Sequence, residues 1–189
     1  KAQWTQKSYR KVKEAHVNLL KRNQVTALKS LVEFATDPEI HSLALPFITH
    51  FYMQSNNSKI AEKMLLTAIK TSPKDLGIIL TLSDLYIKIS LPDNARKLLI
   101  KSRSIFGDTS AILPDLYQIS LILEDYEGAV ATLIEMKKME LLPDFVEPAL
   151  TEILYSTGRI NEISKHTHNR SLVKELEILW DTGKSQGNH

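Results

Sequence analysis

The sequence predicts an all-α fold, a right-handed α-solenoid in which helix–turn–helix units stack side by side and a last helix caps the C-terminal end. Two observations lead to this prediction. Within each unit, apolar residues recur at spacings of three and four, the period of an amphipathic helix. Between units, an alanine with a leucine four places later returns every 34 residues, beginning at Ala27, Ala61, Ala95 and Ala129. Because one helix pair cannot cover its own apolar face, such units must stack on one another.

The composition of the chain suits this fold. Of the 189 residues, 43% are hydrophobic and 24% are charged, so the chain can bury a core. Six glycines and seven prolines are few for a many-turned β-sandwich. Cysteine is absent, which excludes disulfides, Cys-based zinc sites and thiol catalysis.

The 34-residue interval sets the organisation of the chain. The alanine of each pair lets a neighbouring helix approach to about 8–10 Å, and the leucine one turn later fills the space beside it. Short breaks at residues 55–58, 90–94 and 123–125 separate the two helices of a unit. We therefore expect a single domain of residues 1–183, with units at about 8–41, 42–75, 76–109, 110–143 and 144–168, a capping helix at 169–182 and a disordered tail at 184–189.

Turn and cap residues mark the expected helix ends. Residues 71–75, TSPKD, offer cap side chains and a proline at a helix start. Pro46, Pro114 and Pro148 share one column early in the first helix of their units, where a missing N–H costs least. The expected capping helix has an apolar face that shields the last repeat, made of Leu172, Leu176, Leu179 and Trp180.

Other columns at the same interval carry a family resemblance. The unit that begins at Ser42 holds Tyr52, Ala61, Leu65, Ala68 and Pro73. The next unit keeps Tyr86, Ala95 and Leu99, whereas the unit from Ser110 keeps Ala129 and Leu133 and has Tyr117 where a small residue belongs. Over about residues 8–165 this pattern resembles the tetratricopeptide repeat (TPR) family, with the best match in the unit from Ser42.

The resemblance implies a concave groove lined by the first helix of each unit, which would hold an extended peptide or a helix of a partner protein. Ile122 and Phe145 also stand in columns that would line this groove. The alternative for each lining residue is that it only faces solvent or packs locally. The predicted partner-binding residues are His16, His50, Met53, Gln54, Asp84, Ile87, Lys88, Gln118 and Glu152.

One well-known use of the family's groove is disfavoured. Members that grip the C-terminal carboxylate of chaperones do so with Lys and Asn at two positions of their first unit. Here those positions hold Val12 and His16, or Pro46 and His50 one unit later. We therefore do not expect an adaptor for chaperone tails.

Catalytic and metal-binding patterns are absent from the sequence. There is no Gly-rich phosphate loop, no HExxH and no GxSxG. His166 and His168 are two residues apart, a spacing that on a helix points their rings in different directions. We expect a non-enzymatic scaffold without a metal or a cofactor, whose partner is another protein.

Charge is unevenly distributed along the chain. Residues 1–22 have a net charge of +6, and the remainder has −4. The basic N-terminal helix is expected either to be a solvated face or to contact an acidic membrane surface or partner. Because the chain begins at Lys1 without methionine, we expect a fragment. A cytoplasmic location is favoured, either free or anchored through a membrane segment before Lys1 as the soluble part of a membrane-linked assembly.

Two further expectations concern partners. The stretches EMKKMELLPD and LYSTGRINEI resemble the pentatricopeptide repeat, whose members read single-stranded RNA. Pro148 stands at the place of a base-reading side chain, so nucleic acid is the less favoured alternative to a protein partner. A homodimer through the terminal helices is expected if an end of the array is poorly capped.

Overall fold

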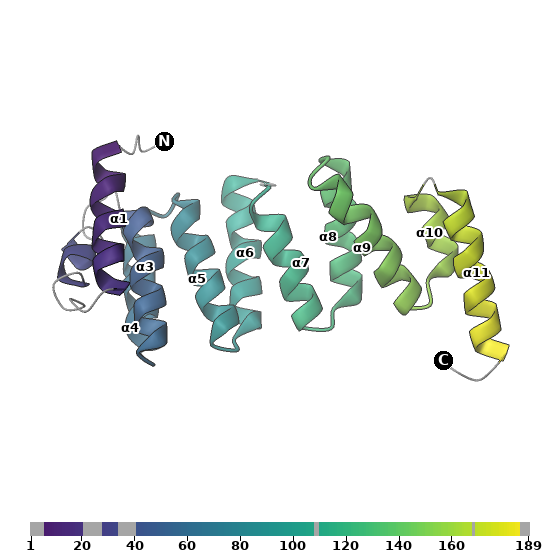
Figure 1. Ribbon diagram of the computed structural model, residues 1–189, viewed down its shortest axis with the longest axis horizontal. Helices are drawn as coiled ribbons and strands as arrows, with labels where there is room; N and C mark the ends of the chain where they lie inside the picture. Colours follow the sequence, from purple (N-terminus) through teal and green to yellow (C-terminus); the bar gives the residue numbers. More distant parts are fainter. Residues whose placement is uncertain (1–5, 21–27, 34–40, 108–109, 168, 186–189) are drawn as a thin grey trace. The chain divides into compact units, whose positions relative to one another are not determined.

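The computed structural model describes residues 6–20, 28–33, 41–107, 110–167 and 169–185, and these residues fold entirely into helices and the turns between them (Figure 1). This confirms the predicted all-α class. The chain divides into two compact units, which we call unit 1 (Lys1–Gly107) and unit 2 (Asp108–His189). Whether both belong to one domain, as the sequence analysis expects, stays a prediction.

Unit 1 is built from consecutive antiparallel helices. They are α1 (Gln6–Leu20), a helix that includes residues 28–33, α3 (His41–Gln54), α4 (Ser58–Thr71), α5 (Leu76–Lys88) and α6 (Pro92–Phe106). Each of α3, α4 and α5 packs against the next helix, and α3 also packs against α1 and α5. The helices α3 and α5 are therefore the first helices of two repeats, and α4 and α6 are the second helices.

Unit 2 repeats this arrangement. Its helices are α7 (Ile112–Ile122), α8 (Tyr126–Lys138), α9 (Pro143–Ser156), α10 (Ile160–His166) and α11 (Arg170–Ser185). Each helix packs against the next one along the chain. Here α7 and α9 are the first helices of their repeats, and α8 and α10 are the second helices.

The repeated small–large pair forms the centre of each unit. Ala61, Ala95 and Ala129 are buried, and the three leucines four residues later in the sequence have no exposed surface. Leu31 is buried in the same way, whereas Ala27 lies outside the described residues. The alanines allow close approach of helices and the leucines fill the adjacent space, as the spacing predicts.

The turn between the two helices of a repeat recurs with the same period. Asn56, Ser90, Glu124 and Gly158 all have a left-handed backbone, with φ between 55° and 74°. The residue after each one donates its N–H to a carbonyl five residues earlier, as Asn57 does to Tyr52 at 2.7 Å. This is the Schellman ending of a helix, which satisfies the last carbonyls and reverses the chain.

Helix starts agree in part with the sequence analysis. Asp75 caps α5, because its carboxylate accepts the N–H groups of Gly77 and Ile78, as expected of residues 71–75. The predicted position of the proline column near the helix start is confirmed for Pro114, the third residue of α7, and is wrong for the other two prolines. Pro46 and Pro148 are the sixth residues of α3 and α9, beyond the first turn in which N–H groups lack intrahelical acceptors. These helices simply begin earlier than the columns suggested.

The capping helix is longer than expected and uses a different face. Helix α11 continues to Ser185, so Lys184 and Ser185 are not part of a disordered tail. The Lys184 ammonium lies 5.3 Å from the centre of the Trp180 ring, a contact that favours the extra turn. Val173, Leu176 and Trp180 pack on the core of unit 2. Leu179 is 58% exposed, because one residue before Trp180 a helix has turned by about 100°.

Candidate functional site: the first-helix faces of the two units

The predicted binding residues of unit 1 lie on its two first helices. His50, Met53 and Gln54 are on α3, and Asp84, Ile87 and Lys88 are on α5. These six residues define the unit-1 face. Its four polar side chains are exposed, whereas Met53 and Ile87 are partly buried. The helices α3 and α5 pack against each other, so the structure brings these residues onto one surface.

Polar residues of the unit-1 face pair along their own helix. The Nε2 atoms of His50 and Gln54 are 2.9 Å apart, and the Lys88 ammonium lies 2.6 Å from a carboxylate oxygen of Asp84. Both pairs have the i, i+4 spacing that places side chains one above the other. An exposed pair of this kind is worth only about 0.3–0.5 kcal/mol, so groups from a partner can replace it at low cost.

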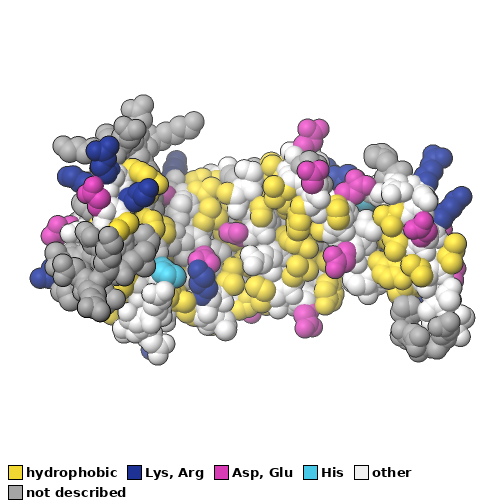
Figure 2. All heavy atoms as spheres, viewed as in Figure 1, with side chains coloured by type: hydrophobic (Ala, Val, Ile, Leu, Met, Phe, Trp, Pro, Cys, Tyr) yellow, Lys and Arg dark blue, Asp and Glu magenta, His cyan; other side chains and the backbone are white. Residues whose placement is uncertain are grey.

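The corresponding surface of unit 2 has a different character. Tyr117, Gln118, Leu121 and Ile122 of α7, with Phe145 and Glu152 of α9, define the unit-2 face. The rings of Tyr117 and Phe145 meet edge to face, with centroids 5.6 Å apart and planes at 75°. Ile122 is 47% exposed and Phe145 is 46% exposed. Figure 2 shows hydrophobic side chains gathered over the α7 and α9 region, with acidic side chains beside them.

Tyr117 is a residue of the unit-2 face that the sequence analysis did not include among the predicted residues. Its signal was visible, because a tyrosine occupies a column that otherwise holds small residues. Thr49, Ser83 and Thr151 of that column are buried between helices, and a tyrosine ring does not fit there. The ring is therefore only partly buried and lies against Phe145. Burial and the nearby negative charge of Glu152 raise the pKa of Tyr117.

The remaining predicted binding residues lie on the unit-2 face or on α1. Gln118 and Glu152 are exposed on the unit-2 face. The side chain of His16 lies outside the described residues. At the positions of the chaperone-tail clamp, Val12 is buried and Pro46 is exposed, so neither offers a charged group to a carboxylate.

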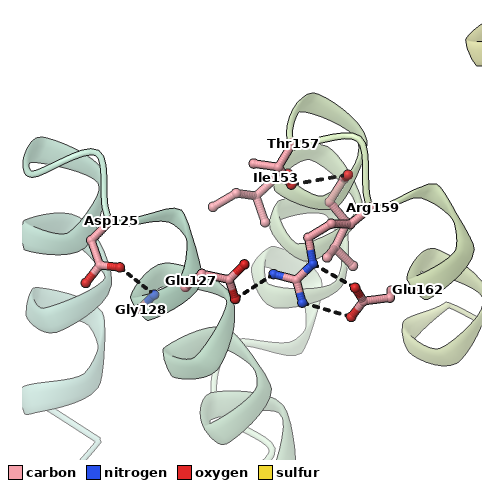
Figure 3. Close-up of polar contacts among 8 residues, drawn as sticks. Asp125, Glu127, Gly128, Ile153, Thr157, Arg159 and Glu162 are labelled. Atoms are coloured by element: carbon pink, nitrogen blue, oxygen red, sulfur yellow. Dashed lines mark hydrogen bonds and ion pairs between the residues drawn. The ribbon is translucent and has the colours of Figure 1, made fainter.

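An arginine cluster ties the helices of unit 2 together on another surface (Figure 3). The Arg159 guanidinium donates to both carboxylate oxygens of Glu162, at 2.7 and 2.8 Å, and to Glu127 at 2.9 Å. The hydrogen bond from Arg159 lowers the pKa of Glu162. Glu127 lies in the first turn of α8 and Glu162 lies in the first turn of α10, so the cluster links the starts of these two helices.

No group of three or more His, Asp and Glu residues in the described part of the chain is placed to hold a metal ion. An open depression of about 400 Å³ between α10 and α11 is lined by Thr167, Arg170, Lys174 and Glu177, among others. Neither finding decides whether the chain is an enzyme, and the expected absence of metal and cofactor stays a prediction.

The basic end of unit 1 presents its charges outward. Arg10, Lys11 and Lys13 of α1 are exposed, whereas Val12 and Ala15 pack in the core. Contact of this helix with an acidic surface stays a prediction. Within the described residues, no helix has the length and apolar content required to cross a membrane.

Sequential helix pairs with a 34-residue period define the class of this chain: it has a TPR-like helical repeat fold. Among solved structures, the chain matches TTC0263, a thermophilic TPR protein of Thermus thermophilus, with a TM-score of 0.56 and 18% sequence identity. The match covers 93% of this chain and 97% of that one. No family model and no curated protein matches the sequence.

Proposed function

We propose that this chain is a non-enzymatic scaffold that binds a peptide or helix of a partner protein along its first-helix faces. The observation that carries the proposal is the unit-1 face. It presents exposed polar groups above the partly buried Met53 and Ile87, on two packed helices of a repeat fold. Polar groups fix the register of a bound segment and apolar side chains supply contact area. The same scaffold would serve as part of a membrane-linked assembly.

The ion pair and the hydrogen-bonded pair of the unit-1 face can be replaced by contacts with a partner. Asp84 and Lys88 form an ion pair in the free protein, so neither charge is isolated on the unit-1 face. A partner with complementary groups would split the pair and gain hydrogen bonds from both side chains. Specificity would come from this match, because a partner that leaves either charge unpaired loses affinity.

A random peptide library displayed on phage tests this proposal. The unaltered chain is expected to enrich peptides, and those that contact unit 1 should bind a His50→Ala/Asp84→Ala/Lys88→Ala variant at least roughly tenfold more weakly. The matched control is Thr67→Ala/Asp93→Ala/Lys97→Ala. It changes exposed residues on the second helices α4 and α6 of the same unit and removes the same charges.

The outcomes separate the candidate functions. Enrichment of peptides whose binding the control variant retains supports a protein scaffold. If no peptide is enriched, and if the chain instead retains labelled single-stranded RNA in a salt-dependent manner, the RNA alternative replaces it. Circular dichroism of both triple variants confirms that they are folded.

A further inference from the structure

The two units differ strongly in charge. Residues 1–107 contain 17 Lys and Arg and 8 Asp and Glu, a net charge of +9, whereas residues 108–189 contain 7 and 14, a net charge of −7. In unit 2 the charged residues of the first helices are all acidic. They are Asp115 on α7 and Asp144, Glu147 and Glu152 on α9. The unit-2 face therefore carries no cation of its own.

The basic residues of unit 2 lie outside α7 and α9, and three of them have contacts of their own. Arg159 is bound to Glu127 and Glu162, and the Lys137 ammonium donates to the backbone carbonyl of His166. Lys184 lies over the ring of Trp180 on α11. Glu152, in contrast, is an exposed carboxylate, and its negative charge contributes to the raised pKa of Tyr117. A cation brought to this face by another molecule would meet first helices whose own charged residues are all acidic.

Apolar and aromatic surface adjoins these carboxylates. Tyr117 and Leu121 are four residues apart on α7, as are Gln118 and Ile122, so the four side chains share one side of the helix. Phe145 on α9 meets Tyr117 across the helices. Aromatic rings attract cations through their faces, and a flanking carboxylate adds to this attraction. The unit-2 face thus combines an apolar surface that can contact an apolar side chain with adjacent carboxylates that can bind a cation.

We propose that the unit-2 face binds a partner segment in which a Lys or Arg adjoins a bulky apolar side chain. The apolar side chain packs on Phe145 and Ile122, and the cation lies between Glu152 and the Tyr117 ring. This inference rests on the proposed scaffold function and specifies the chemistry of the partner for unit 2.

A second copy of the chain is the competing occupant, because α1 exposes Tyr9 beside Arg10 and Lys11. Docking of α1 on the unit-2 face of another copy would be a heterologous contact. It leaves α1 free at one end and the unit-2 face free at the other, so it closes into a ring or propagates into a filament. We therefore assign the face to a segment of a separate partner protein, and self-association is an outcome of the test.

The probe is the peptide library, read by the composition of the enriched sequences. Sequences retained by the unaltered chain are synthesised with a fluorophore and titrated by anisotropy against single variants. We expect one group of the enriched peptides to contain a Lys or Arg next to Leu, Phe, Trp or Tyr. This group should bind Phe145→Ala roughly tenfold more weakly and Glu152→Gln roughly fivefold more weakly.

Two controls match these variants. Ile178→Ala removes an exposed apolar side chain and Glu175→Gln removes an exposed carboxylate, both on α11 of the same unit. Neither is expected to change binding by more than about twofold. Replacing the peptide's Lys or Arg by Gln should weaken binding to the unaltered chain but have little effect on binding to the Glu152→Gln variant, which couples the cation to this carboxylate.

Several results would overturn the inference. Enriched peptides without cations are one, and equal effects of Glu152→Gln and Glu175→Gln are another. Sedimentation that shows self-association abolished by Phe145→Ala assigns the face to a second copy. If peptides bind but depend only on His50, Asp84 and Lys88, the scaffold function stands and this inference fails. If no peptide binds at all, the scaffold function itself fails.

Discussion

The first-helix faces of the two units show how one column of a repeat changes a surface. In unit 1 the small-residue column holds Thr49 and Ser83, both buried between helices. The surface above them is polar, and its charges cancel in the Asp84–Lys88 pair. In unit 2 the same column holds the buried Thr151 on α9 but Tyr117 on α7, and the Tyr117 ring lies against Phe145 and forms an aromatic surface with acidic neighbours. A residue too large for the helix interface thus becomes part of the face.

The difference teaches that repeats of one architecture can present unlike chemistry. The columns that pack the helices, Ala95 with Leu99 and Ala129 with Leu133, are equally buried in both units. The residues that differ between the two units lie at positions that this packing leaves exposed. The surface chemistry can therefore differ from unit to unit while the packing of these core columns stays the same. Substitutions should have their largest effects in the shared packing and their smallest at a single buried hydroxyl.

Removal of a shared core leucine should destabilise the unit that contains it. Leu99→Ala in unit 1 and Leu133→Ala in unit 2 each create a cavity at a fully buried site, with an expected loss of about 2–5 kcal/mol. Hydrogen exchange followed by mass spectrometry reports protection in each unit separately. If the units unfold independently, each variant loses protection only in its own unit. Equal loss in both units would instead favour the single domain that the sequence analysis predicts.

The left-handed turn position should tolerate different residues unequally. At Gly158, φ is +74°, and a Cβ would lie 3.2 Å from the Trp180 ring. Gly158→Ala is therefore expected to cost about 1–2 kcal/mol in urea unfolding.

The equivalent Glu124 also has a left-handed backbone but belongs to a turn that accepts a side chain. Glu124→Gly should raise stability by about 0.5–1 kcal/mol, because it removes the steric cost of the Cβ. A loss of stability in that variant would show that the turn depends on the glutamate side chain rather than on backbone strain.

Two tyrosines should make stability fall at alkaline pH. Burial raises the pKa of Tyr86 and of Tyr117, with further contributions from Glu62 and from Glu152 respectively. The folded state therefore holds these phenolic protons more tightly than the unfolded state does. The resulting stabilisation is fully present below a pH of about 10 and is lost as pH rises through the raised pKa values. Urea unfolding of Tyr86→Phe and Tyr117→Phe should show a weaker decline above that pH.

The same two variants distinguish the units at neutral pH. The Tyr86 hydroxyl donates to Glu62 at 3.0 Å, so Tyr86→Phe should cost about 1 kcal/mol. Tyr117→Phe keeps the ring contact with Phe145 and should cost less than about 0.5 kcal/mol. Equal costs at neutral pH would mean that the Tyr117 hydroxyl has a role that its surroundings do not suggest.

The smallest effect is expected at Ser83. Its hydroxyl is buried without a hydrogen-bond partner among the described residues, so Ser83→Ala should leave stability unchanged or raise it by up to about 1 kcal/mol. Ser102 is the comparison, because its hydroxyl donates to the carbonyl of Leu98 at 2.8 Å. Thermal unfolding of both alanine variants should rank Ser83→Ala as the more stable. The reverse order would indicate that the Ser83 hydroxyl has a partner in solution.

Part of the candidate site could be read from the sequence. The positions of His50, Gln54, Asp84 and Lys88 on first helices follow from the repeat register, and the structure places all four on one exposed face. Their pairing within each helix follows from the i, i+4 spacing. That these residues bind a partner stays a prediction. The Tyr117–Phe145 contact could not be predicted, because the tyrosine ring is too large for the helix interface and its final position depends on the neighbouring helix.

The sequence by itself determined the helix pairs, their 34-residue period and the alanine and leucine columns of the core. These follow from local spacing and from the need of each helix pair to cover its apolar face. The tertiary structure alone decided the rest. The left-handed turn column holds Asn, Ser, Glu and Gly, which share no side-chain chemistry, since only backbone geometry is selected there. The exposure of Leu179 and the pairing of Tyr117 with Phe145 depend on which neighbour fills each space, and contacts between distant residues settle that.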